Sequence, residues 1–236
     1  MFDDLQVLCF DLDDTFWDVR QVLDRAEQRV GAFLERRYPR LARRHGRADF
    51  LAARLQLAAA APDRAHDLTW LRTETMRRLA VAEGYPDEAG AEAFEVFIAA
   101  RNEVELFPDV QPALERLGTR FRLATLSNGN ADLHRIGLAP LFSAMLNAAG
   151  VGVAKPHPGA FAAVARELGC EPAQMLYVGD DPHADVLGAR AAGLRTAWVN
   201  RRAAAWPDVG PAADLEISSL EQLEAALSPR ALSRRS

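Results

Sequence analysis

The sequence predicts an α/β fold in which a parallel sheet is interrupted, directly after its first strand, by a long helical insert. Short apolar runs, typical of buried strands, occur near the N-terminus and again in the second half of the chain. In that second half they alternate with helical segments, which implies crossover connections and a parallel sheet. Between the two regions the periodicity is helical and contains no convincing strand.

The first strand is predicted at Val7–Phe10, an apolar run that ends at Asp11. The insert follows from about Gln21 to Glu103, where Ala, Leu, Arg and Glu recur with helical periodicity. Turn-forming residues break this pattern near Pro39, Gly46, Pro62 and Gly84-Tyr85-Pro86. The spacing of these breaks predicts about four helices.

After Phe107-Pro108 the pattern alternates between strands and helices. Strands are predicted at 121–126, 145–148, 175–178 and 195–199, the second of them weaker than the others. Helices are predicted at 110–117, 158–168, 184–192 and 220–227, and the polar, basic segment 228–236 is expected to fray. The expected domains are therefore a discontinuous α/β core, residues 1–18 and 105–236, and a helical domain, residues 19–104.

Composition excludes several classes of protein. The chain has 236 residues, of which 49% are hydrophobic and 26% charged, as in ordinary water-soluble globular proteins. Its net charge of -5 argues against a general nucleic-acid binder, which needs a basic surface. No apolar run approaches the ~20 residues of a membrane span, and the acidic N-terminus does not resemble a signal peptide. Cys9 and Cys170 cannot build a disulfide framework, so a reducing, cytoplasmic location is expected.

Polar residues follow four of the predicted strands at their carboxyl ends, where open parallel sheets bind ligands. The clusters are Asp11-Leu12-Asp13-Asp14-Thr15, Ser127-Asn128-Gly129-Asn130, Lys155-Pro156-His157-Pro158 and Gly179-Asp180-Asp181-Pro182, with Asp185 further on. A single acidic cluster is usually a solvated edge or a helix cap, but four aligned clusters of complementary chemistry indicate a site. Facing carboxylates repel one another unless a cation lies between them, and oxygen ligands suit Mg²⁺.

Lys155 is the single lysine among 28 basic residues, the others being arginine. The chain thus uses arginine for its solvated positive charge, and a compact ammonium differs chemically from a planar guanidinium. A surface lysine ahead of a proline-bounded turn is the simpler alternative. The position of Lys155 among the four clusters favours a role in the site instead.

In their order and at their strand ends, the four motifs resemble those of the haloacid dehalogenase superfamily, in its phosphatase branch. The resemblance covers nearly the whole chain and implies a doubly wound, Rossmann-like core with a type-1 helical cap as the insert. It further implies that Asp11 is the nucleophile, Asp13 the general acid/base, Ser127 the phosphate-binding hydroxyl and Lys155 the lysine of the third motif. Asp180 matches the acidic metal ligand, and Asp11 with the backbone carbonyl of Asp13 would complete the protein's share of a Mg²⁺ shell.

Residues beside these motifs are given supporting roles. Asn128 and Gly129 are expected to hold phosphate oxygens, with glycine allowing the backbone to approach closely. Trp17 is assigned to the substrate pocket, with core packing as the alternative. Asp185, one turn into a helix, is expected to orient the site rather than bind the metal. The roles of two further residues stay open: Asp181 and His183.

The expected function is Mg²⁺-dependent hydrolysis of a small phosphorylated metabolite through an aspartyl-phosphate intermediate. Finer details of the motifs resemble a bacterial subgroup that includes phosphatases of flavin mononucleotide and of a phosphorylated ribitylaminouracil in riboflavin synthesis. In the insert, residues 66–72 combine polar and aromatic side chains and are the best candidates for substrate recognition. No nucleic-acid or membrane partner is expected, and the protein is expected to be a monomer or homodimer.

Three alternatives share part of this pattern. A sugar phosphomutase of the same superfamily shares every core motif and differs only in its cap. A haloacid dehalogenase uses the same nucleophile without Mg²⁺ but should lack the second aspartate, so Asp13 speaks against it. A phospho-accepting receiver module, from a different class, also combines acidic residues, Mg²⁺, a hydroxyl and a lysine. Receivers are much shorter, and they hold their phosphoryl group rather than releasing phosphate repeatedly.

Overall fold

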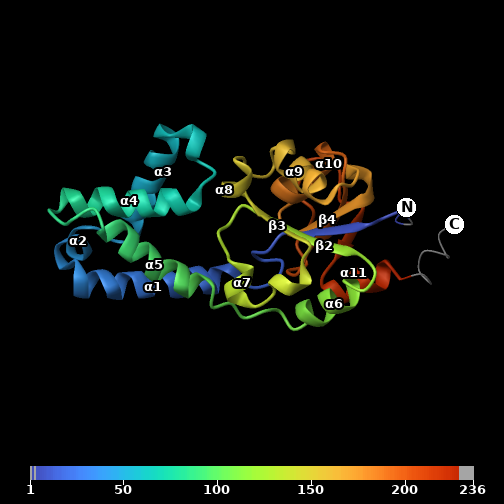
Figure 1. Ribbon diagram of the computed structural model, residues 1–236, viewed down its shortest axis with the longest axis horizontal. Coiled ribbons are helices and arrows are strands. Elements are labelled where there is room, and N and C mark those ends of the chain that lie inside the picture. The colour runs from blue at the N-terminus through green and yellow to red at the C-terminus, as the bar shows by residue number, and fades with distance from the viewer. Residues whose placement is uncertain (1, 3, 229–236) are drawn as a thin grey trace. The chain divides into compact units, whose positions relative to one another are not determined.

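The structure is a computed structural model that describes residue 2 and residues 4–228 (Figure 1). The chain divides into two compact units. The α/β unit comprises the residues up to Asp18, Glu105–Gly129 and those from Gly137 onward. The helical unit comprises Val19–Val104 and Asn130–Ile136. The segment 130–136, which the sequence assigns to the α/β core, thus groups with the helices of the insert.

Six parallel strands form the sheet of the α/β unit, in the order β3-β2-β1-β4-β5-β6. Their bounds are β1 Val7–Phe10, β2 Arg122–Ser127, β3 Ala144–Asn147, β4 Met175–Gly179, β5 Arg195–Val199 and β6 Leu215–Ile217. All residues of β1 and β4 are buried, as expected for strands that helices cover on both faces. Because the strands are parallel, their carboxyl ends lie at one edge of the sheet, with β1 near its centre.

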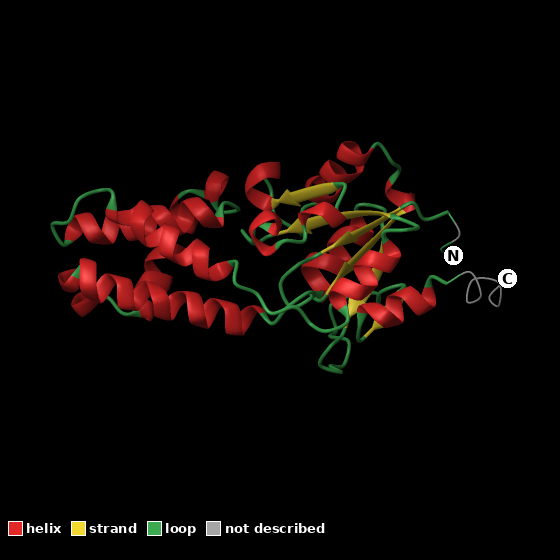
Figure 2. Ribbon diagram, turned by 60° about the horizontal axis from the view of Figure 1, so that its bottom comes forward, coloured by secondary structure: helices red, strands yellow, loops and turns green. Residues whose placement is uncertain are grey.

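Helices cover both faces of this sheet. Figure 1 shows α9 and α10 above the sheet and α6 and α11 below it, and Figure 2 shows helices on both sides of the strands. The helices are α6 Val110–Leu117, α8 Ala148–Val151, α9 Pro158–Leu168, α10 Gly188–Ala191 and α11 Leu220–Ala226. On α9, Phe161 packs edge-to-face on Tyr177 of β4, with the ring centroids 5.0 Å apart. The predicted α/β fold class with a doubly wound parallel sheet is confirmed.

The helical unit is a bundle built on one long amphipathic helix. Its helices are α1 Val19–Arg37, α2 Pro39–Arg44, α3 Arg47–Ala60, α4 Leu68–Ala82, α5 Ala89–Arg101 and α7 Leu133–Ile136. The buried residues of α1 recur every four positions: Val22, Ala26, Val30 and Leu34. Such spacing puts them on one helix face, and the last three pack with Ala80 of α4 and Phe97 of α5.

Three local predictions differ from the structure. Residues 19–101 contain five α-helices rather than about four, because the short segment Pro39–Arg44 forms a helix of its own. The helix predicted at 184–192 begins as a π-helical turn, Pro182–Leu187, and only then continues as α10. Strand β6 is not predicted from the sequence, because its three residues are too few for an alternating pattern to be recognised.

The predicted fraying of 228–236 falls, apart from Ser228, outside the described residues. Among the residues that the structure does describe, no helix combines the length and the apolarity that crossing a bilayer requires.

Candidate active site

Four of the predicted site residues lie together at the carboxyl edge of the sheet. Asp11 directly follows β1, Ser127 ends β2, and Asp180 follows β4. Lys155 reaches the same place from the loop that precedes α9. The Asp11, Ser127 and Lys155 side chains are buried. Their arrangement follows from strand order, because β1 lies between β2 and β4.

The Lys155 ammonium uses all three of its N–H donors inside this site. Its Nζ donates to Asp11 Oδ1 at 2.5 Å, to Asp185 Oδ1 at 2.7 Å and to the Tyr177 hydroxyl at 2.7 Å. The Tyr177 hydroxyl in turn donates to the backbone carbonyl of Leu126 at 2.7 Å. Only 3% of the lysine side chain is exposed, so this chain of bonds fixes the ammonium beside Asp11.

The carboxylates of Asp11, Asp180 and Asp185 share the site with this one ammonium. Burial and these neighbouring charges shift the pKa values of several groups in the site. Burial raises the pKa of Asp11 to about 7 even though the Lys155 charge lowers it. Burial also raises the pKa of Asp180 to about 8, and the Asp11 and Asp185 carboxylates raise it further. Burial alone would lower the pKa of Lys155, but Asp11 and Asp185 raise it above its usual range. The negative charge therefore exceeds what one lysine compensates.

Oxygen atoms of Asp11, Asp180 and Asp185 lie within 4.8 Å of one another, close enough to share a metal ion. A set of carboxylate oxygens suits a hard cation such as Mg²⁺. Asp185 is already bonded through both oxygens, because Oδ1 accepts from Lys155 and Oδ2 accepts from the backbone N–H of Asp181 at 3.0 Å. Asp11 and Asp180 are consequently the better placed ligands.

Gly179, at the end of β4, leaves the space that the Asp185 carboxylate occupies. A Cβ atom at this position would lie 2.3 Å from Asp185 Oδ2, much closer than any van der Waals contact allows. The π-helical turn at Pro182–Leu187 brings Asp185 over Gly179, where it is 1% exposed. The glycine before Asp180 is thus required by the buried aspartate that bonds to Lys155.

Gly179→Ala is expected to destabilise the fold by about 1–3 kcal/mol, the usual cost of overpacking a core, and to lower activity by displacing Asp185. Urea-induced unfolding and steady-state kinetics would measure the two effects. Gly31→Ala is the matched control, since a Cβ there meets no heavy atom within 4 Å. Equal unfolding free energies for the two alanine variants would contradict the proposed role of Gly179.

The segment after Asp11 forms a tight turn that holds Asp13. Trp17 is fully buried, and its indole Nε1 donates to Asp13 Oδ1 at 2.8 Å. Isolated bridges join Trp17 to Asp13 and to Leu106. Arg201 supports the turn, since its guanidinium donates to the backbone carbonyl of Thr15 at 2.9 Å. The assignment of Trp17 to the substrate pocket stays a prediction; in the structure the indole contacts and orients Asp13.

The loop after β2 is bonded to the lysine loop by two hydrogen bonds. The Asn128 amide Nδ2 donates to the Lys155 carbonyl at 2.9 Å, and the Lys155 N–H donates to Asn128 Oδ1 at 2.8 Å. The Gly129 N–H donates to Ser127 Oγ at 2.9 Å. The Asn128 side chain therefore positions Lys155, so any contact of Asn128 with phosphate would come from its backbone N–H.

A model of the haloacid dehalogenase-like hydrolases matches residues 5–193, most of the chain. The chain belongs to this family. The 5-amino-6-(5-phospho-D-ribitylamino)uracil phosphatase YigB of Escherichia coli is 30% identical over 199 residues, which are 83% of each chain. The phosphoserine phosphatase of Thermus thermophilus is 39% identical over 126 residues, 51% of this chain and 50% of that protein. A solved 2-haloacid dehalogenase from Pseudomonas syringae has a TM-score of 0.90 at 34% identity, covering 98% of this chain and all of that one.

The remaining residues near the motifs of this hydrolase have structural roles. Asp181 caps the π-helical turn, since its Oδ1 accepts from the backbone N–H groups of His183 and Ala184 at 2.8 and 2.7 Å. Both Asp181 and His183 are exposed. His157 caps α9 by accepting from the Gly159 N–H at 3.0 Å. Cys9 is buried in β1, and burial raises the pKa of its thiol far above the usual range.

Sequence reasoning missed two residues of the site. The sequence predicts Tyr177 only as part of an apolar strand, although the hydroxyl of a tyrosine in a fully buried strand needs a hydrogen-bond partner. Arg201 forms a bidentate ion pair with Asp109, both contacts 3.0 Å, besides its bond to the turn after Asp11. No local sequence pattern predicts this ion pair, because 92 residues separate Asp109 from Arg201.

Proposed function

We propose that this hydrolase is a Mg²⁺-dependent phosphatase that acts on a small phosphorylated metabolite through an aspartyl-phosphate on Asp11. The observation that carries the proposal is the position of Asp13, two residues after Asp11 and fixed by the indole N–H of Trp17. A phosphate ester leaves an alkoxide, which needs a proton, and a held carboxylic acid can supply it. A halide is a good leaving group and needs no such acid.

The donor set of the site fits Mg²⁺. Asp11 and Asp180 would hold the ion together with the backbone carbonyl of Asp13, while Asp185 positions Lys155. Burial and the neighbouring carboxylates raise the pKa of Asp180, and a bound cation would relieve this repulsion. When bound, Mg²⁺ would offset the repulsion between the Asp11 carboxylate and the anionic phosphoryl group.

The side chains divide the reaction into two displacements. A carboxylate oxygen of Asp11 attacks phosphorus, the bond to the ester oxygen breaks, and Asp13 gives its proton to the departing alkoxide. Asp13, now ionised, takes a proton from water as the water oxygen attacks the aspartyl-phosphate. Inorganic phosphate leaves, and Asp11 is regenerated. Lys155, held by Asp185 and Tyr177, neutralises charge on Asp11 and the phosphoryl group throughout.

Hydrolysis of a 2-haloacid is a second candidate function, because the similar structure from Pseudomonas syringae is named a 2-haloacid dehalogenase. The decisive assay supplies both kinds of substrate to the same preparation. Phosphate release is measured with a panel of phosphorylated metabolites that includes flavin mononucleotide and the YigB substrate, with Mg²⁺ and with EDTA. Chloride release is measured with 2-chloropropionate. The proposal requires Mg²⁺-dependent phosphate release, and EDTA-resistant chloride release without phosphate release would overturn it.

Asp13→Asn is expected to slow hydrolysis of alkyl phosphates by about 10²- to 10⁴-fold, the usual loss when a general acid is removed. Aryl phosphates should suffer less, because an aryl oxide leaves without full protonation. Steady-state kcat for the two substrate classes measures the difference. An equal loss for alkyl and aryl phosphates would show that Asp13 is not the acid.

A further inference from the structure

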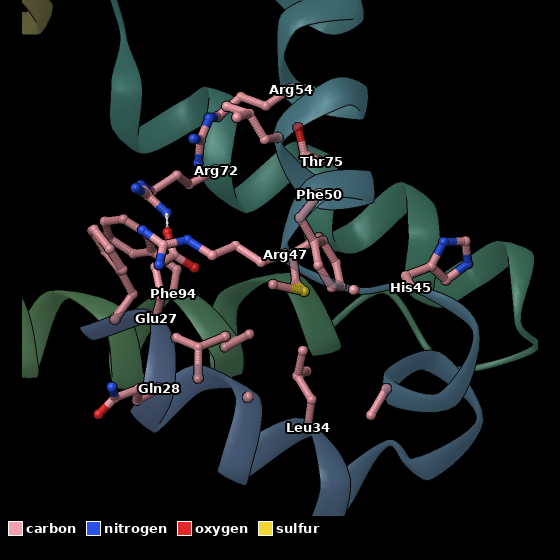
Figure 3. Close-up of a pocket in the computed structure, with 18 of the residues that line it drawn as sticks. Glu27, Gln28, Leu34, His45, Arg47, Phe50, Arg54, Arg72, Thr75 and Phe94 are labelled. Carbon is pink, nitrogen blue, oxygen red and sulfur yellow. Dashed lines mark hydrogen bonds and ion pairs between the residues drawn. The ribbon is translucent and has the colours of Figure 1, made fainter. Parts of the chain in front are cut away.

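The helical unit contains a cavity of about 420 Å³ that the proposed reaction does not use. Helices α1, α2, α3, α4 and α5 line it together with the residues between α2 and α3 (Figure 3). All the residues that line it belong to the helical unit. Its apolar wall includes Leu23, Val30, Leu34, Phe50, Met76 and Phe94. The volume lies within the range of small-molecule sites, roughly 300–1,000 Å³.

Charged side chains gather on one side of this cavity. Figure 3 shows Arg47, Arg54 and Arg72 there, away from His45. Two acidic residues of α1 compensate two of the three arginines. Asp24 Oδ1 lies 2.8 Å from Arg47 Nη1, and Glu27 Oε1 lies 2.7 Å from Arg72 Nη1.

Arg54 is left as the uncompensated charge. It is half-buried, and it forms no hydrogen bond or ion pair with the part of the chain that the structure describes. Burial lowers the pKa of Arg54, and the Glu27 carboxylate only partly offsets this. Burial also lowers the pKa of Arg72 to about 10, and the Arg54 charge lowers it further. The Arg54 and Arg72 charges thus repel each other, and of these two side chains only Arg72 is bonded to the Glu27 carboxylate.

Thr75 adds a polar group without a partner. It lines the cavity from α4 and is 4% exposed, and its Oγ1 accepts and donates no hydrogen bond among the described residues. A buried hydroxyl without a partner is costly, so such groups usually mark a bound molecule or water.

We propose that this cavity binds a small organic acid: an apolar body of six to ten carbon atoms that carries one carboxylate. The carboxylate would pair with the planar forks of Arg54 and Arg72, which match its two oxygens. The apolar body would lie against Leu34, Phe50 and Phe94. The third carboxylate of the lining, Glu35, lies about 12 Å further along α1 from Glu27, so Arg54 is the one arginine of this cluster without a paired carboxylate. A single unpaired arginine favours a monoanion, because a phosphate dianion would leave excess negative charge beside Glu27.

Calorimetric titration of the full chain with octanoate tests the proposal. Saturable, one-to-one binding with a Kd below about 1 mM is expected, and 1-octanol, which has the same chain without the charge, should bind at least about tenfold more weakly. Arg54→Met should weaken octanoate binding by at least about tenfold. Arg36→Met is the matched control, since it removes an exposed arginine of the helical unit that does not line the cavity.

A second variant fills the space. Gly31 lines the cavity from α1, and a Cβ there meets no heavy atom within 4 Å, so Gly31→Leu should project into the cavity and block octanoate. Leucine also suits a helix better than glycine, so an unchanged or higher melting temperature will show that the variant folds. Absence of octanoate binding, undiminished binding by Gly31→Leu or Arg54→Met, or equal affinity for octanol would each overturn the proposal.

Discussion

Asp11→Asn is expected to abolish phosphate release, lowering kcat by more than about 10⁴-fold, because an amide cannot form the aspartyl-phosphate. The fold should survive the change. Asparagine has nearly the shape of aspartate, and the substitution removes a buried charge whose desolvation raises its pKa to about 7. Lys155 keeps Asp185 as its counter-ion. The measurement is phosphate release under saturating Mg²⁺, with thermal melting to report the fold.

Asp181→Asn provides the matched control for this experiment. Asp181 lies in the same group of motifs, yet it is exposed and caps a turn through its Oδ1. Asparagine caps such turns as well as aspartate does, so this variant should keep most of its activity. Phosphate release by Asp11→Asn near the parent rate, in a preparation shown by mass spectrometry to be free of deamidated chain, would remove Asp11 from the role of nucleophile.

Lys155→Arg is the second change for which a very large effect is expected, a loss in kcat of roughly 10³-fold or more. The ammonium fits three acceptors at 2.5, 2.7 and 2.7 Å in a site where its side chain is 3% exposed. A guanidinium is larger and planar, and it cannot meet three acceptors arranged around a single nitrogen. The melting temperature of Lys155→Arg should also fall, because Asp11 and Asp185 lose a compact buried partner.

Tyr177→Phe is a milder test of the hydrogen-bond geometry around the Lys155 ammonium. It keeps the Lys155 charge and removes one of its three acceptors, so activity should fall far less than in Lys155→Arg, with KM changed less than kcat. Steady-state kinetics and melting curves of both variants give the comparison. If Lys155→Arg kept the kcat of the parent, or lost no more than Tyr177→Phe, the ammonium would have no specific role.

The bounds of a helix or strand could be predicted from the sequence where its apolar pattern is local and strongly periodic. The bounds predicted for β1, α6, α9 and β5 agree with the structure, because each is a clear apolar pattern bounded by turn residues or charge. The main site residues follow predicted strands along the chain: Asp11, Asp13, Ser127, Lys155 and Asp180. In a parallel sheet the carboxyl ends of the strands lie at one edge, so these residues are expected to lie together. The fold class followed from the same alternation of strands and helices.

The remainder depends on contacts that sequence spacing does not encode. Asp185 bonds to Lys155 across 30 residues, and the π-helical turn that allows this has no propensity signature. The hydroxyl of Tyr177 is hidden within an apolar strand. Segment 130–136 groups with the helical unit through bonds such as that from the Asp132 N–H to Asn102 Oδ1, 2.8 Å, which no local pattern predicts.

The central position of β1 has a consequence for how the protein loses activity on heating. Its backbone N–H and C=O groups are bonded to β2 on one side and β4 on the other, and helices cover both faces. The amides of Val7–Phe10 should therefore exchange with deuterium only when the whole unit unfolds, whereas those of the edge strand β6 exchange through local opening. Asp13 lies outside the sheet, on the turn beyond β1, which is held by the bond from the Asp14 N–H to the Trp17 carbonyl, 2.9 Å, and by the Trp17 indole. Heat inactivation should accordingly begin with displacement of Asp13, at temperatures where Asp11 is still in place.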